Sequence, residues 1–292
     1  MDIEDLRTFV EVADAGGVTS AARRLGICKS IVSRRLARLE NNLGAQLLAR
    51  TTRGAALTEA GATFRDHAAK ICAEIDVAEE LVRPVGALRG RLRIAAPLTF
   101  GATHFAPVLT ALAQQHRELH VHASYSDHMV DLVAEGFDCA IWYGLRERSD
   151  TPAVRVGPMR AVYVASPAYI ERHGAPDTPE EMVAHQALLS DEAWPATDEG
   201  TVIEMRPPCR FRADAGIALV PAVLAGLGIA GLPFPAVEGY LASGELVTVM
   251  TRYPVPELAI WVSTPPNQHR VARKVQVLTD MLIARFGAPE SA

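Results

Sequence analysis

The sequence has few cysteines, no apolar run of membrane length and no export signal, and each absence excludes a class of protein. The four cysteines, at positions 28, 72, 139 and 209, are scattered without Cys-x-x-Cys spacing, which argues against a disulfide scaffold and a zinc site. No apolar run approaches a membrane span, and the acidic start 1–5 lacks the basic and apolar regions of a signal peptide. We therefore expect a cytoplasmic protein without membrane contact.

The sequence also lacks the motifs of the common enzyme classes. It contains no Gly-x-Ser-x-Gly, no His-Glu-x-x-His and no P-loop. Gly226–Gly231 matches Gly-x-Gly-x-x-Gly, but it follows an expected helix and precedes an expected strand, the reverse of the order that binds a pyrophosphate. His120 and His122, near His116 and His128, alternate along an expected strand and should face solvent rather than bind a metal. We expect no enzyme activity, no metal and no cofactor.

Positive charge is concentrated in one stretch of an otherwise acidic chain. Residues 19–53 hold eight lysines and arginines against one acid, whereas the whole chain has a formal net charge of -5. The same stretch predicts a helix over 20–25 capped by Thr19, a break at Gly26 and a longer helix over 29–43. Two helices joined by a short glycine turn have the spacing of a helix-turn-helix, which binds DNA.

The longer helix has an apolar face and a basic face. Apolar residues recur at i, i+4, i+7 and i+11 and predict the buried face: Val32, Leu36, Leu39 and Leu43. The side chains that we expect to contact DNA lie on the other face: Lys29, Ser30, Ser33, Arg34, Arg35 and Arg38. A recognition helix needs this division, because its back is held by the core while its amino-terminal half contacts bases and phosphates. The alternative is a solvated basic helix.

A small hairpin is expected directly after this helix. Apolar residues near 47 and 57 flank a centre that contains Arg50, Arg53 and a glycine. The hairpin can act as a wing whose two arginines reach the DNA backbone or the minor groove. This neighbour favours DNA binding over the solvated alternative.

A long helix from Thr58-Glu59 carries an apolar seam. The seam residues alternate at spacings of four and three: Phe64, Ala68, Ile71, Ile75, Ala78 and Val82. Such a seam buries its apolar edge against the equivalent helix of a second chain, which predicts dimerisation; the alternative is a helix packed on its own domain. Pro84, Gly86 and Gly90 end the helix and form a joint, so a domain boundary is expected near residue 90.

From Arg91 onward, strands alternate with helices. Strands are expected over 92–96, 119–125 and 137–143, with helices over 101–116 and 127–135 between them. A second set follows, with strands near 160–165, 187–189, 210–213 and 229–232 and helices near 179–185 and 215–225. This order predicts two α/β lobes with mostly parallel sheets. The last helix, about 268–286, is expected to return to the first lobe.

Ligands of open α/β sheets bind beyond the carboxyl ends of strands, near free amides of helix amino termini. The candidate ligand residues follow expected strands: Thr99, Phe100, Trp142, Tyr143, Ser190 and Asp214. We expect Thr99 and Phe100 to contact the ligand, the two residues at 142 and 143 to shape the site, and Ser190 to donate a hydrogen bond. The alternatives are core packing for Phe100 and Trp142 and a helix cap for Asp214.

These segments resemble one known family over nearly the whole chain. Residues 1–69 look like the amino-terminal domain of LysR-type transcriptional regulators, through "VSRRLARLENNLG" and "LLARTTRGAALTEAG". The second half resembles the family's effector domain, through "GRLRIAAPLTFG" and "SDHMVDLVAEGFDCAIWYG". Two positions depart from the family pattern. Cys28 precedes the recognition helix where many relatives have a small hydroxyl cap, and Trp142 replaces a common arginine, which favours an aromatic or largely apolar effector over a carboxylate.

The resemblance implies both a fold and a function. It implies a winged helix-turn-helix over 1–58, a linker helix with a hinge over 59–90, and over 91–292 a two-lobed α/β domain similar to periplasmic solute-binding proteins. Such regulators bind a dyad operator in double-stranded DNA, respond to a small organic effector between the lobes, and assemble as homotetramers, dimers of dimers. A stand-alone solute-binding module and an enzyme on the same lobes are the alternatives. The first 90 residues discriminate, because a solute carrier would have an export signal there.

Overall fold

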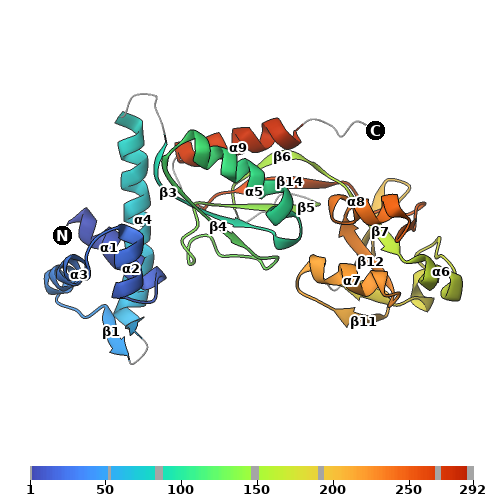
Figure 1. The fold of residues 1–292 in the computed structure, drawn as a ribbon, viewed down its shortest axis with the longest axis horizontal. Coiled ribbons are helices and arrows are strands. Elements are labelled where there is room, and N and C mark those ends of the chain that lie inside the picture. The colour runs from blue at the N-terminus through green and yellow to red at the C-terminus, as the bar shows by residue number, and fades with distance from the viewer. Residues whose placement is uncertain are drawn as a thin grey trace. The chain divides into compact units, whose positions relative to one another are not determined.

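The structure is a computed structural model that describes two units of the chain. The described residues are 2–51, 54–82, 88–145, 151–189, 194–266 and 271–287. Their contacts group Met1–Gly86 with Val133–Gly136 as one unit and Ala87–Leu132 with Phe137–Ala292 as the other (Figure 1). The finer division at residues 58 and 90 stays a prediction.

The amino-terminal unit consists of helices and one hairpin. Its elements are α1 (Ile3–Asp14), α2 (Val18–Leu25), α3 (Lys29–Leu43), β1 (Leu48–Thr51), β2 (Gly54–Leu57) and α4 (Glu59–Val82). The predicted bounds of α3 are confirmed, and Gly26 ends α2 with a φ of 66°, a left-handed conformation that favours glycine. The predicted cap at Thr19 is wrong, because α2 begins at Val18 with Gly17 in the cap position.

The core of this unit holds the back of α3. Val32, Leu36 and Leu39 are buried as predicted, around a fully buried Phe9 from α1. Leu43 is 37% exposed, so its predicted burial is wrong. Leu43 is the last residue of α3, and the left-handed Gly44 that follows ends the helix.

The seam of α4 is divided between this core and solvent. Ala68 is fully buried in the core, and the rings of Phe64 and Phe9 lie 5.6 Å apart. These two seam residues therefore pack on their own domain, which was the alternative to dimerisation. Ile71 is 40% exposed and Ala78 is exposed, whereas the side chain of Val82 lies outside the described residues.

The first lobe of the second unit is built on a five-stranded sheet in the order β4-β3-β5-β14-β6. Its elements are β3 (Arg89–Ala96), α5 (Leu98–Gln115), β4 (Glu118–Tyr125), β5 (Cys139–Gly144), β6 (Ala153–Met159), β14 (Leu258–Ser263) and α9 (Arg273–Phe286). β3 is parallel to β4 and β5, but β14 is antiparallel to β5 and β6. The sheet is mixed rather than mostly parallel. The helix predicted over 127–135 is wrong, since this segment forms bends and turns.

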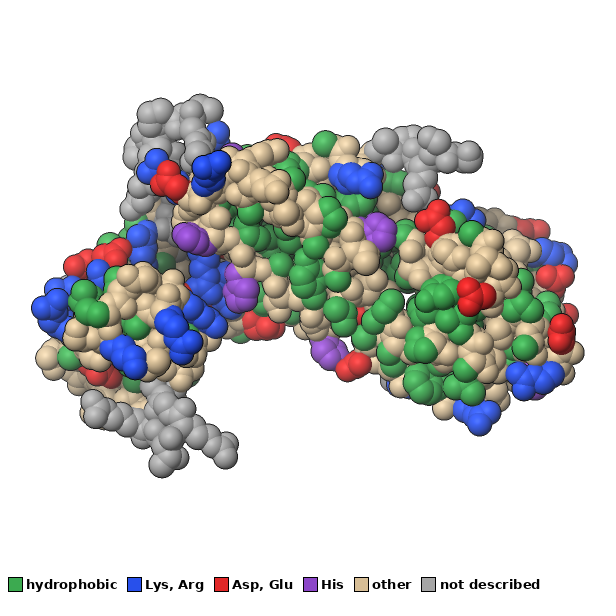
Figure 2. All heavy atoms as spheres, viewed as in Figure 1, with side chains coloured by type: hydrophobic (Ala, Val, Ile, Leu, Met, Phe, Trp, Pro, Cys, Tyr) green, Lys and Arg blue, Asp and Glu red, His purple; other side chains and the backbone are tan. Residues whose placement is uncertain are grey.

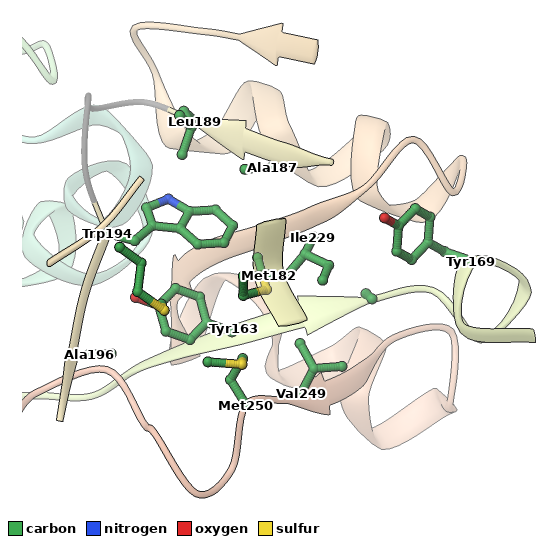
Figure 3. Packing of buried hydrophobic residues seen from close by; sticks show 12 residues of the cluster. Tyr163, Tyr169, Met182, Ala187, Leu189, Trp194, Ala196, Ile229, Val249 and Met250 are labelled. Carbon is green, nitrogen blue, oxygen red and sulfur yellow. The ribbon is translucent and has the colours of Figure 1, made fainter. Parts of the chain in front are cut away.

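The second lobe has another mixed five-stranded sheet, in the order β11-β8-β12-β7-β13. Its elements are β7 (Ala161–Ala165), α6 (Pro167–His173), η1 (Glu181–Ala184), β8 (Ala187–Leu189), β9 (Trp194–Asp198), β10 (Thr201–Met205), β11 (Cys209–Arg212), η2 (Gly216–Ala218), α7 (Leu219–Leu224), β12 (Ile229–Pro233), α8 (Phe234–Ser243) and β13 (Val247–Val249). Val162 and Val164 pack with residues of α7 and α8. The intervening Tyr163 packs on the opposite face with Trp194 and Met182 (Figure 3).

The last helix returns to the first lobe, as predicted. A partly buried ion pair joins it to the sheet: Lys274 Nζ of α9 lies 2.9 Å from Asp138 Oδ1 and also donates to the carbonyl of Arg91. Asp138 Oδ2 accepts the amide of Arg93 at 2.7 Å. The side chain of Lys274 is only 6% exposed. Removal of its ammonium would leave the carboxylate of Asp138 without its charged donor where water has limited access.

We predict that Lys274→Met lowers the local free energy of unfolding of this lobe by roughly 3 kcal/mol. Hydrogen exchange at the amides of β3 and β5 measures this change. The matched control is the double variant with Asp138→Asn, which removes the unpaired charge and should lose less than the single variant. A single variant within about 0.5 kcal/mol of the wild type, the range of surface substitutions, would contradict the prediction.

Candidate nucleic-acid interface and ligand cavity

The amino-terminal half of α3 presents polar side chains to solvent. Lys29, Ser30, Ser33 and Arg34 are all exposed, on the side opposite the buried Val32. Figure 2 shows Lys and Arg side chains gathered on the surface of this unit. The face therefore has hydroxyl and cationic donors for phosphates and base edges.

Two of the predicted DNA-binding arginines are paired with acidic side chains of α1 and its cap. Arg38 makes a bidentate contact with Asp5, at 2.7 Å from Nε to Oδ2 and 2.5 Å from Nη2 to Oδ1, and the Asp5 side chain is fully buried. This hydrogen bond raises the pKa of Arg38. Arg35 Nη1 lies 3.1 Å from Glu4 Oε2 and 3.1 Å from Thr8 Oγ1. These arginines hold α3 against α1, a role that sequence reasoning did not separate from DNA contact.

Cys28 occupies the cap position of α3 without forming a side-chain cap. Its Sγ lies 3.0 Å from Ser30 Oγ. This hydrogen bond is the main cause that lowers the pKa of the exposed Cys28 thiol, with a contribution from the amide of Ile31. The thiol therefore sits among donors at the start of the recognition helix.

The hairpin that follows α3 is held by a carboxylate from α3 itself. Glu40 Oε1 accepts the amides of Leu47 at 2.8 Å and Leu48 at 3.1 Å. β1 and β2 pair antiparallel with Arg50 opposite Ala55, which confirms the predicted hairpin. The side chain of Arg50 and the whole of Arg53 lie outside the described residues. Glu40 thus fixes the wing relative to the recognition helix.

A cavity of about 580 Å³ lies between the two lobes of the second unit. The first lobe contributes Trp142 and Tyr143 at the end of β5, and the second contributes Tyr163 and Trp194. The Tyr163 and Trp194 rings are 4.8 Å apart, and Tyr163 donates from its hydroxyl to the carbonyl of Pro195 at 2.6 Å. Burial raises the pKa of Tyr163, so its phenol keeps its proton. The cavity has aromatic walls from both lobes.

The two predicted residues at the end of β5 do line this cavity. Trp142 Nε1 donates to Ser263 Oγ at 2.6 Å, and its ring stacks on Trp261 with centroids 5.9 Å apart. A Cβ on Gly144 would come within 2.9 Å of the Trp142 ring, so the glycine leaves room for it. The Trp142 ring is therefore fixed in place and still accessible from the cavity.

Thr99 and Phe100 are not among the residues that line the cavity. Phe100 is 3% exposed and stacks on His104 at 4.1 Å, within a cluster that includes Phe105 and Phe286. Phe100 is thus a core residue, the alternative to ligand contact. Thr99 is also buried, and Thr99 Oγ1 accepts the amide of Ile217 at 3.0 Å, which connects α5 to η2 of the second lobe.

Asp127 also lines the cavity, although the sequence analysis did not name it as a site residue. Its Oδ1 accepts the amides of Leu98 at 2.7 Å and Thr99 at 3.2 Å, and its Oδ2 accepts the hydroxyl of Thr99 at 2.6 Å. Oδ2 also accepts the amide of Gly216 at 3.2 Å. The sequence analysis expected a helix over 127–135, but the amides that Asp127 binds belong to the start of α5 rather than to its own segment.

The remaining predicted ligand residues differ in their placement. Asp214 lines the cavity with its side chain 76% exposed, and its Oδ2 lies 3.3 Å from His128 Nε2. Its expected role as a helix cap is not seen, since Ala215 precedes η2. Ser190 lies outside the described residues. Within the part of the chain that the structure describes, no three His, Cys, Asp or Glu side chains are grouped to hold a metal.

A helix-turn-helix with an exposed cationic face, in one chain with a two-lobed domain around a cavity, defines a ligand-responsive DNA-binding regulator. Residues 3–62 match the model of the bacterial regulatory helix-turn-helix protein, lysR family, and residues 86–287 match the LysR substrate binding domain. A helix-turn-helix-type transcriptional regulator of Xanthomonas campestris is 32% identical over 295 residues, which cover 98% of this chain and 86% of that protein.

Solved structures agree over nearly the full length. The Vibrio cholerae virulence activator AphB, a member of the LTTR protein family, is 27% identical with a TM-score of 0.60, covering 97% of this chain and 99% of that chain. CrgA, a LysR-type transcriptional regulator from Neisseria meningitidis, is 26% identical with a TM-score of 0.59, covering 99% of this chain and 100% of that chain.

The chain belongs to the LysR family of transcriptional regulators. It is therefore a regulator with a DNA-binding helix-turn-helix and an effector-binding domain, not an enzyme. Of the helices that the structure describes, none combines the length and apolar character needed to cross a bilayer.

We predict that Arg34→Ala mainly affects DNA binding, whereas Arg38→Ala mainly affects stability. Arg34→Ala should weaken operator binding by roughly 1 to 3 kcal/mol with an unchanged melting temperature, because it removes a solvent-facing donor. Arg38→Ala should lower the melting temperature, because it leaves the buried Asp5 unpaired. Mobility shifts on a duplex selected by the wild type, together with thermal unfolding, measure both effects. Equal melting temperatures for the two variants would refute the division of roles.

Proposed function

We propose that this regulator binds a dyad operator with the exposed half of α3. Ser30, Ser33 and Arg34 reach base edges and nearby phosphates, Lys29 contacts the backbone, and the wing arginines Arg50 and Arg53 add backbone contacts. The exposure of the α3 side chains and the pairing of Arg35 and Arg38 with α1 support this assignment. The last two arginines serve to position the helix.

The effector is a small organic molecule that binds in the 580 Å³ cavity between the lobes. The aromatic walls from both lobes carry this proposal, because cavities of this size with mostly apolar walls are typical of small-molecule sites. A ligand held by both lobes favours one lobe arrangement over another. It changes transcription only through this difference in affinity.

Self-association uses the part of the α4 seam that its own domain leaves uncovered. Ile71 is 40% exposed on α4, one turn beyond the buried Ala68. An apolar edge of this kind is buried when two such helices pack together. The assembled form is a dimer of dimers that acts in the cytoplasm, where its operator is.

We predict that Trp142→Ala abolishes the effector response in a reporter strain while operator affinity stays within a few-fold of the wild type. The substitution removes one wall of the cavity and leaves the helix-turn-helix untouched. Phe211→Ala is the matched control, because Phe211 is an exposed aromatic residue that does not line the cavity. A normal response in the Trp142 variant would exclude this cavity as the effector site.

For assembly, we predict that Ile71→Asp with Ile75→Asp yields a species that no longer dimerises and no longer binds a dyad operator. Burying the two new charges would cost several kcal/mol. Sedimentation velocity measures the oligomeric state, and Lys70→Asp, an exposed position on the same helix, is the control for added charge. If the double variant sediments like the wild type, α4 does not carry the interface.

A further inference from the structure

The hydrogen bonds of Asp127 account for both of its carboxylate oxygens. Oδ1 receives the first two amides of α5, from Leu98 and Thr99, and Oδ2 receives the Thr99 hydroxyl and the Gly216 amide, at 2.6 to 3.2 Å. All four partners are donors, which suits an ionised carboxylate because this group only accepts. The side chain comes from the loop after β4, and its partners come from both lobes.

This carboxylate takes the place that an anionic ligand would take. Free amides at the start of a long helix attract anions, and α5 has 18 residues. Here the chain supplies the anion itself. A carboxylate ligand at the same amides would have to displace Asp127 or lie beside its charge. Space is limited as well, since a Cβ on Gly216 would come within 3.0 Å of Thr99 Oγ1.

The described residues in the rest of the cavity wall offer little for a negative charge. Among the described residues that line it, none is a lysine or arginine, and the imidazole of His128 lies 3.3 Å from the carboxylate of Asp214, a second acid. The indole of Trp142 and the phenol of Tyr163 already donate to Ser263 and Pro195. Among the described residues, what the wall offers besides these groups is mainly the ring surface of Trp142, Tyr143, Tyr163 and Trp194.

We propose that Asp127 is a built-in carboxylate that fills the anion position at the start of α5, so that the cavity selects an uncharged aromatic molecule instead of a carboxylate. The rings of Trp142, Tyr143, Tyr163 and Trp194 bind the flat body of the ligand. The proposal rests on the proposed function, since it names the ligand class of the same cavity. It also makes Asp127 a specificity-determining residue.

The test compares benzamide and benzoate, two probes of nearly equal size of which only benzoate is charged. Isothermal titration of the full chain should show that the wild type binds benzamide more tightly than benzoate. Asp127→Ala frees the α5 amides and should bind benzoate at least about tenfold more tightly than the wild type does. Asp214→Ala is the matched control. It removes one acid from the cavity but leaves the α5 amides occupied, so its benzoate affinity should rise far less.

Two results would overturn the proposal. One is a wild type that prefers benzoate to benzamide, and this comparison holds even if Asp127→Ala does not fold. The other is an Asp127→Ala variant whose benzoate affinity does not exceed that of Asp214→Ala. Either failure differs from a failure of the cavity as effector site, which the reporter response of Trp142→Ala decides without these probes.

Discussion

A carboxylate that loses all or part of its contact with water must be matched by donors, and this constraint fixes the junctions of the molecule. Asp5 binds Arg38 and sets α3 against α1. Asp138 binds Lys274 and sets α9 against the first sheet. Asp127 ties the start of α5 to η2 of the other lobe. Each aspartate connects elements far apart in the sequence, so the surfaces for DNA and ligand inherit their geometry from these bonds.

Local patterns were enough to predict the bounds of α3, although not the start of α2. The bounds of α3 follow from apolar spacing and from Gly26 and Gly44, whose left-handed conformations end α2 and α3. The same reasoning failed at 127–135, where an aspartate followed by apolar residues reads as a capped helix. The carboxylate of Asp127 caps α5 instead, 28 residues away in sequence, and no local signal distinguishes the two uses.

Only some of the candidate site residues could be predicted, because local sequence does not show which distant groups a side chain will contact. Strand ends placed Trp142, Tyr143 and Asp214 at the cavity, because the ends of parallel strands meet at one edge. Thr99 follows a strand too, but its hydroxyl is consumed by contacts with Asp127 and Ile217. The apolar spacing of α4 was read correctly, but spacing does not show whether a given turn packs on its own domain or on a second chain. Phe64 packs on Phe9, whereas Ile71 remains exposed.

The distribution of tryptophan has a practical consequence. The chain has three tryptophans, at positions 142, 194 and 261, and none of them lies in the helix-turn-helix unit. Two line the cavity, and the third stacks on Trp142 at 5.9 Å. Intrinsic fluorescence of the unlabelled protein is therefore emitted almost wholly from around the ligand cavity. The emission spectrum should change when a ligand occupies the cavity and should be nearly insensitive to contacts made by α3. Ligand binding can therefore be observed separately from DNA binding in one sample.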